Sequence, residues 1–152
     1  MYTFNFFAGV ELNTVNILMM MIEQKLKEGT TKFVLFISSI GGSTYAGISA
    51  YNFMKGIPAK VETYNFGMAN YVALVLSCAG SKPLSVPHVT FLLHGVQNNF
   101  PQGASLEEDQ LIKRIKALQT DTENIAGIIA TTTEKPEVDV LRDMRGRTTL
   151  YP

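Results

Sequence analysis

The chain has 152 residues, 46% of them hydrophobic, and this length and apolar content predict one domain with a substantial core. Thirteen basic and thirteen acidic side chains cancel, which argues against nucleic acid or an anionic membrane as a partner. The single cysteine, Cys78, excludes an intrachain disulfide, and the lack of Cys/His clusters argues against a metal site. The N-terminus lacks a basic leader and no apolar run reaches about 18 residues, so we expect a cytoplasmic protein without a signal peptide or membrane span.

Short apolar runs alternate with segments of helical period, a pattern that predicts an α/β fold. Four strands are expected, at 2–7, 32–38, 60–65 and 89–93. Three helices are expected between them, at 13–26, 44–54 and 70–78. Asn13 and Ser43 are the predicted N-caps of the first two helices, and Gly29 and Gly80 follow the ends of the first and the third. The run 32–38 is almost wholly apolar, which is typical of a strand buried on both faces.

The pattern changes from Ser105 onward. Ser105 and Glu108 suggest a capping box, and a helical period continues from there to about Thr131. Such a helix would be roughly 40 Å long at 1.5 Å per residue, against a domain diameter of about 38 Å. We therefore expect it to overhang its own domain and to meet a partner chain. The alternative is a helix broken near 120–124 that packs on its own domain.

The last part of the chain predicts one short helix and little else. Pro136 is expected at the first helical position, followed by a helix over 137–144. The segment 145–152 shows no strand pattern. It is interpreted as a flexible tail, or as the end of a domain whose closing element is missing or short.

Three features that are suited to binding or catalysis follow predicted strands. Gly41-Gly42 stands between a buried strand and a helix, where bare N–H groups can face a ligand oxygen. The turn 67–71 leads into the next helix and places Tyr71 at its N-terminus. His94 follows the strand 89–93. Because sites in open α/β sheets form at the carboxyl ends of strands, the three are expected to lie together.

These residues resemble a known family. The segment 36–54, FISSIGGSTYAGISAYNFM, resembles the glycine-rich turn and Ala-Gly helix of the ClpP peptidase family, with Ile40 where proline is usual. The segment 67–80, GMANYVALVLSCAG, is similar to its nucleophile helix, and 86–95, VPHVTFLLHG, to the segment that ends in its catalytic histidine. The resemblance covers about residues 10–141. It implies a single ClpP/crotonase-like domain over 1–152, built from repeated ββα-type units, with a protruding handle helix at about 95–131.

The resemblance also implies roles for individual residues. Gly41 and the backbone N–H of Val72 would form the oxyanion hole, and His94 would be the general base. Tyr71 stands where the family has its serine nucleophile. For the third triad member, the alignment offers Arg147 or Gly146, with Asp143 one turn away as a candidate acid.

Tyrosine is a poor substitute for serine at this position. Its oxygen lies about 6.5 Å from Cα against about 2.4 Å for serine, so it overshoots the roughly 3 Å reach of a base placed for serine. A phenol with a pKa near 10 is also mostly protonated at neutral pH. Ser43, as a cap, and Ser77, inside an apolar helix, offer no replacement. We expect no ordinary serine-peptidase turnover from this sequence.

Three functional hypotheses remain open. The first is a ClpP-class serine peptidase subunit whose nucleophile is altered. The second is a non-catalytic scaffold subunit of such a ring, with Tyr71 filling the pocket. The third is a crotonase-like acyl-CoA enzyme, in which two backbone N–H groups hold a thioester oxygen. The missing acidic residue near the hole makes this the weakest of the three.

The family resemblance implies partners as well. Its members form heptameric rings that stack through the handle, take peptide or protein substrates, and dock unfolding ATPases. The chain starts almost at its first strand, which predicts that the family's N-terminal axial loop is absent and argues against ATPase docking. No Gly-x-x-x-x-Gly-Lys loop occurs, so ATP would belong to the partner and no cofactor is expected in this chain.

Overall fold

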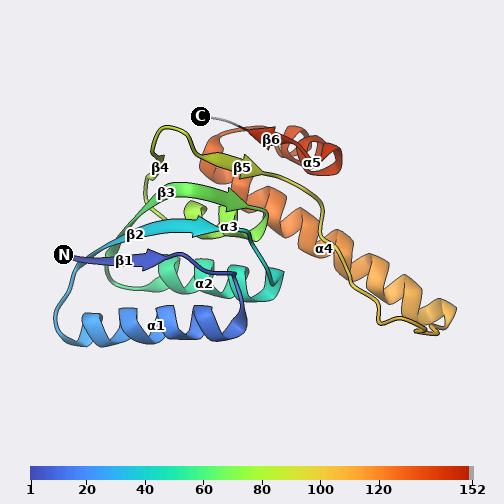
Figure 1. Ribbon diagram of the computed structural model, residues 1–152, viewed down its shortest axis with the longest axis horizontal. Helices are drawn as coiled ribbons and strands as arrows, with labels where there is room; N and C mark the ends of the chain where they lie inside the picture. Colours follow the sequence, from blue (N-terminus) through green and yellow to red (C-terminus); the bar gives the residue numbers. More distant parts are fainter. Residues whose placement is uncertain (151–152) are drawn as a thin grey trace.

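A mixed β-sheet forms the centre of the computed structural model, which describes residues 1–150 (Figure 1). Its strands within that range are β1 (Tyr2–Phe6), β2 (Lys32–Ser39), β3 (Lys60–Asn70), β4 (Pro83–Ser85), β5 (Thr90–Leu92) and β6 (Thr149–Leu150). The strand order is β1-β2-β3-β5-β6, with β4 also paired to β3. All described pairings are parallel except β5 with β6, which is antiparallel. The predicted α/β fold is therefore confirmed.

The helices of the described residues are α1 (Leu12–Lys27), α2 (Thr44–Gly56), α3 (Val72–Cys78), α4 (Glu108–Thr133) and α5 (Glu137–Gly146). Helices α1 and α2 run side by side along one face of the sheet, and α5 lies near the end of the chain beside β6 (Figure 1). None of the helices within residues 1–150 combines the length and the apolar character needed to cross a membrane.

Two predicted helix caps are wrong by a few residues. Helix α1 begins after Glu11 rather than at Asn13, because the Glu11 backbone N–H donates to Thr14 Oγ1 at 3.0 Å. Helix α4 is capped in the same way by Glu107 and Gln110 instead of Ser105 and Glu108. In both cases a side chain three residues later reaches back to the N-cap, which is the reciprocal contact of a capping box. Pro136 is likewise the N-cap of α5 and not its first residue.

The sheet extends further than the sequence pattern predicts. Strand β3 continues through the turn 67–70, because Met68, Ala69 and Asn70 pair with β5. The segment after α5 forms β6, contrary to the predicted tail, because it pairs with the strand that precedes His94. The last two residues of that tail lie outside the described residues. Strand β4 has no predicted counterpart.

Helix α3 is buried along its whole length. The Ser77 hydroxyl donates to the Ala73 carbonyl at 3.3 Å, the bond that the sequence predicts for a hydroxyl inside an apolar helix. Burial raises the pKa of the Cys78 thiol to about 11. This cysteine is therefore a packing residue rather than a reactive thiol.

Helix α4 is continuous from Glu108 to Thr133 and is not broken near 120–124. Its buried residues, Ile125, Ala126 and Ile129, all lie in its second half. The first half extends away from the sheet (Figure 1). The boundaries of a separate handle at 95–131 and the single domain over 1–152 stay predictions.

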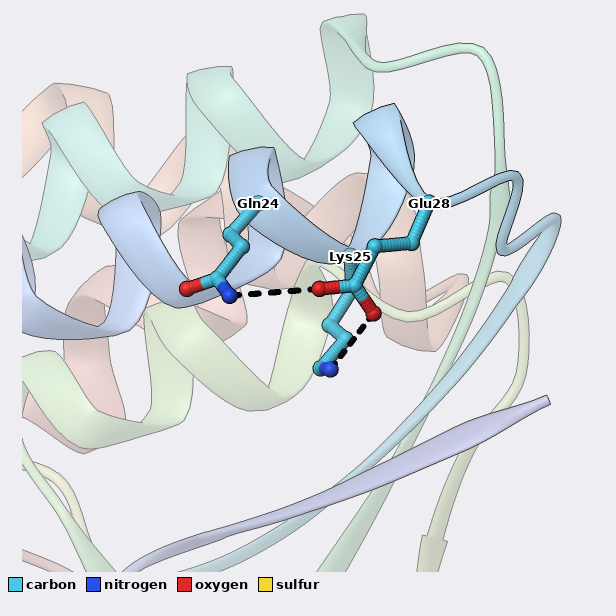
Figure 2. Close-up of polar contacts among 3 residues, drawn as sticks. All are labelled: Gln24, Lys25 and Glu28. Carbon is cyan, nitrogen blue, oxygen red and sulfur yellow. Dashed lines mark hydrogen bonds and ion pairs between the residues drawn. The ribbon is translucent and has the colours of Figure 1, made fainter.

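The end of α1 is held by a small polar cluster (Figure 2). The Glu28 carboxylate accepts from Gln24 Nε2 at 3.2 Å and pairs with Lys25 Nζ at 2.6 Å. The Lys25 ammonium also lies 4.8 Å from the centre of the Tyr2 ring. Because Tyr2 begins β1, this lysine connects the last turn of α1 to the edge of the sheet.

Candidate functional site

The carboxyl ends of three strands bring the predicted site residues together. Gly41 follows β2, Tyr71 follows β3, and His94 comes two residues after β5. Gly42, Tyr71 and His94 line one cavity of about 420 Å³, together with residues from α2 and α4. A pocket where adjacent parallel strands end is the usual place for a site in an α/β sheet.

Tyr71 occupies a sharp turn between β3 and α3. Its φ of 52° and ψ of −118° lie in a region that residues with a side chain rarely adopt. The turn is fixed from both sides, because Tyr71 N–H donates to the Leu92 carbonyl at 2.7 Å and its carbonyl accepts from Leu74 N–H at 3.0 Å. The backbone is therefore that of a strained elbow which presents residue 71 to the cavity.

The Tyr71 side chain fills much of the space at this elbow. Its ring stacks on the His94 ring, with centroids 4.5 Å apart and an interplanar angle of 12°. Its hydroxyl forms a hydrogen bond with Thr44 Oγ1, and the side chain is buried. Burial raises the pKa of the Tyr71 phenol, the bond with Thr44 opposes that rise, and the Asp121 carboxylate adds to it.

The His94 ring is held in a definite tautomer. Its Nδ1 lies 2.8 Å from the Gly95 carbonyl, which can only accept, so Nδ1 carries the proton. In the neutral ring, Nε2 is then an acceptor, which is the form that a general base needs. The bond that holds this tautomer goes to the backbone and not to a carboxylate.

The backbone around Gly41 is shaped for close approach. Gly41 has a φ of 91°, and a Cβ added there would lie 2.7 Å from the Asn70 carbonyl oxygen. Its N–H donates to Ser39 Oγ at 3.2 Å. Val72 is the first residue of α3, where backbone N–H groups have no partner within the helix. The two predicted oxyanion donors thus flank the Tyr71 elbow.

A comparison with protein-family models matches the Clp protease family over residues 10–151. The chain belongs to the Clp protease family. Among curated proteins, it is 27% identical over 148 residues to an ATP-dependent Clp protease proteolytic subunit of Barbarea verna, covering 91% of this chain and 72% of the relative.

Other Clp protease relatives are similar over a shorter span. The proteolytic subunit of Arabis hirsuta and the chloroplastic subunit 1 of Arabidopsis thaliana are each 27% identical over 117 residues, covering 71% of this chain. The aligned parts make up 60% of each of these relatives. The chain thus spans less than two thirds of their length.

The structure separates the candidates for a third triad member in this Clp protease chain. Leu93 N–H donates to the Thr148 carbonyl at 2.9 Å, which aligns β5 with β6. Arg147 precedes Thr148 and His94 follows Leu93, so the antiparallel register brings Arg147 alongside His94. Gly146 ends α5. Asp143 lies elsewhere, in a cavity with Leu93 and Val140, and lies 3.8 Å from Lys135.

Two residues of the Clp protease cavity were not predicted. Thr44, the first residue of α2, bonds with Tyr71, and Asp121 of α4 lines the same cavity. A sequence signal exists for Asp121, because it lies four residues before the buried Ile125 and so on the inward face of α4. For Thr44 we find no signal, since a threonine after an N-cap is common in any helix.

Proposed function

We propose that this chain is a proteolytic-subunit homologue of the Clp protease family that keeps the peptidase site but does not hydrolyse peptide bonds in its present sequence. The observation that carries the proposal is the stack of the Tyr71 ring on His94, with the phenol oxygen bonded to Thr44. Peptide hydrolysis needs a nucleophilic oxygen within about 3 Å of the base. At this position a ring covers the base instead.

The chemistry of the phenol supports the same proposal. A buried phenol with a raised pKa has very little phenolate at neutral pH, and its oxygen forms a hydrogen bond with Thr44 rather than with His94. The ring also occupies the space beside the elbow that a scissile carbonyl would need. The roles of Gly41 and Val72 as oxyanion donors and of His94 as base remain part of this proposal.

Two versions of the proposal differ in what the chain does. It is either a peptidase subunit whose nucleophile position is altered, or a scaffold subunit in which Tyr71 closes the pocket. The match to the Clp protease family leaves the crotonase-like acyl-CoA alternative without support. The strained elbow favours the first version, because residues held at such φ and ψ values cluster at active sites.

An assay on the chain and on Tyr71→Ser separates the two versions. With a serine-directed fluorophosphonate, we expect no labelling of the chain itself and labelling of the Tyr71→Ser variant at residue 71. A fluorogenic peptide should be cleaved only by the variant. Tyr71→Phe serves as the control, since it keeps the ring and removes the hydroxyl.

Each outcome has a definite meaning. Labelling or cleavage by the unaltered chain that is lost in His94→Ala would contradict the proposal of inactivity. A folded Tyr71→Ser variant that is neither labelled nor active would favour the scaffold subunit. Circular dichroism of each variant shows whether it is folded.

We further propose that the chain assembles into a heptameric ring, which can stack into a double ring. The relatives are named as subunits of an ATP-dependent protease. Helix α4 exposes Leu111, Ile112 and Ile115 on its protruding half, which is an apolar surface that an assembly would cover. Analytical ultracentrifugation should give a mass several times that of one chain. A monomer at all concentrations would contradict this assembly.

Two further points are proposed from the relatives. The start of the sequence argues against docking of an unfolding ATPase, whereas the relatives are named as ATP-dependent, which favours such a partner. Co-sedimentation of the chain with an unfolding ATPase tests which expectation holds. A cytoplasmic location stays a prediction, and one relative is named as chloroplastic. Fractionation of cells that produce the chain would decide it.

A further inference from the structure

The cavity beside Tyr71 and His94 contains a single acidic side chain. Its surface is mostly polar, and Asp121 is the only Asp, Glu, Lys or Arg among the described residues that line it. Ser43, which caps α2, Thr44 and the amides of Gln97, Asn98 and Asn99 contribute further polar groups. The cavity therefore carries one negative charge at neutral pH.

This charge is not neutralised within the chain. None of the salt bridges found among residues 1–150 includes Asp121. The residue is half-buried and lies one turn before Ile125, which packs in the core, so its place on α4 is fixed. A half-buried carboxylate next to a cavity is stabilised most by a cation that enters the cavity.

Asp121 is also close to the reactive end of the cavity. Its charge contributes to the raised pKa of the Tyr71 phenol, which places the two side chains within electrostatic reach. A group bound by Asp121 would thus lie next to the elbow and the imidazole. In a protease site, the substrate side chain next to the scissile peptide bond binds at this position.

We propose that Asp121 makes this cavity a binding site for an arginine side chain of an extended peptide. The inference rests on the proposed function, in which the cavity is the peptide site of a Clp protease subunit. The Asp121 carboxylate accepts two N–H bonds from the guanidinium, and the amide oxygens of Asn98 and Asn99 can accept others. Asp121 is then a specificity-determining residue.

The chemistry of the cavity favours arginine over other side chains. An acidic side chain would be repelled by Asp121, and an apolar one would leave the polar groups without partners. A guanidinium has five donors in one plane and matches a carboxylate in a bidentate arrangement. The ring of Tyr45, 75% exposed at the rim of the cavity, offers a flat face on which a guanidinium can stack. A volume of about 420 Å³ is ample for this side chain.

The test measures binding and does not depend on turnover. Two fluorescein-labelled pentapeptides, Ala-Ala-Arg-Ala-Ala and its analogue with citrulline in place of arginine, are titrated with the full chain by fluorescence anisotropy. Citrulline keeps the shape of arginine and removes its charge. We expect the arginine peptide to bind about tenfold more tightly. Asp121→Asn should reduce this ratio to about one and leave the affinity for the citrulline peptide unchanged.

Asp109→Asn is the matched control. Asp109 lies on the same helix, is exposed in its first turn and does not line the cavity, so its variant should keep the tenfold ratio. Equal affinities for the two peptides, an arginine preference that persists in Asp121→Asn, or no binding of either peptide would each overturn the proposal. Mass spectrometry of the same samples reports cleavage by the unaltered chain, which would contradict the proposed function and not the role of Asp121.

Discussion

A Tyr71→Ser/Arg147→Asp double variant is expected to hydrolyse a fluorogenic peptide on the order of 100 times faster than Tyr71→Ser alone. The serine removes the ring that stacks on His94. Arg147 comes just before Thr148, whose carbonyl accepts from Leu93 N–H, and it stands where the family resemblance expects the third triad member. An aspartate at that position would stabilise the imidazolium and orient the ring.

The kcat of the variants at several pH values checks this prediction. Arg147→Gln, which removes the charge without adding an acid, should give an intermediate rate. If the double variant is folded and no faster than Tyr71→Ser, Arg147 does not occupy the third triad position.

Substitution by alanine is expected to change the free energy of unfolding in opposite directions at two helical glycines, Gly47 and Gly127. A Cβ at Gly47 would lie 2.2 Å from Val72 Cγ2, and Val72 is fully buried with a branched, stiff side chain. Gly47→Ala should therefore lower the free energy of unfolding by about 1–3 kcal/mol. A Cβ at Gly127 meets nothing within 4 Å. Gly127→Ala should raise it by about 0.5–1 kcal/mol, because alanine favours the helix.

Urea denaturation followed by circular dichroism measures both values on one scale. Gly127→Ala is the control for the helix propensity that Gly47→Ala gains as well, so the difference between them isolates the clash with Val72. Because Val72 begins α3, Gly47→Ala should also shift the predicted oxyanion N–H. A Gly47→Ala variant that is as stable as Gly127→Ala would show that α2 and α3 can separate without cost.

Most of the fold could be predicted from residue pattern alone. The strand 32–38 is almost wholly apolar, and Gly29 and Ser43 mark the ends of the neighbouring helices. These elements occur within one or two residues of the prediction. The residue pattern does not predict a strand where pairing with a distant strand determines the structure. Residues 66–70 look like a turn, yet they continue β3 because β5 supplies partners for them. Residues 149–150, a threonine and a leucine, are too few to show a strand pattern, and they form a strand for the same reason.

For the site, too, some features follow from the residue pattern and others from the packing of distant segments. The residue types at the ends of the strands can be read from the sequence: a glycine pair, a tyrosine at an elbow and a histidine, in an order that resembles the Clp protease family. The sequence also shows that no serine stands at the elbow. These are properties of adjacent residues, and they are visible without a structure.

The contacts that these side chains make with one another depend on the tertiary structure. The stack of Tyr71 on His94, the bond of its hydroxyl to Thr44 and the presence of Asp121 in the same cavity join residues from four elements and their loops. The pairing of β5 with β6 joins segments more than fifty positions apart in the chain. Such contacts depend on the packing of distant segments, and no periodicity or spacing in the sequence encodes them locally.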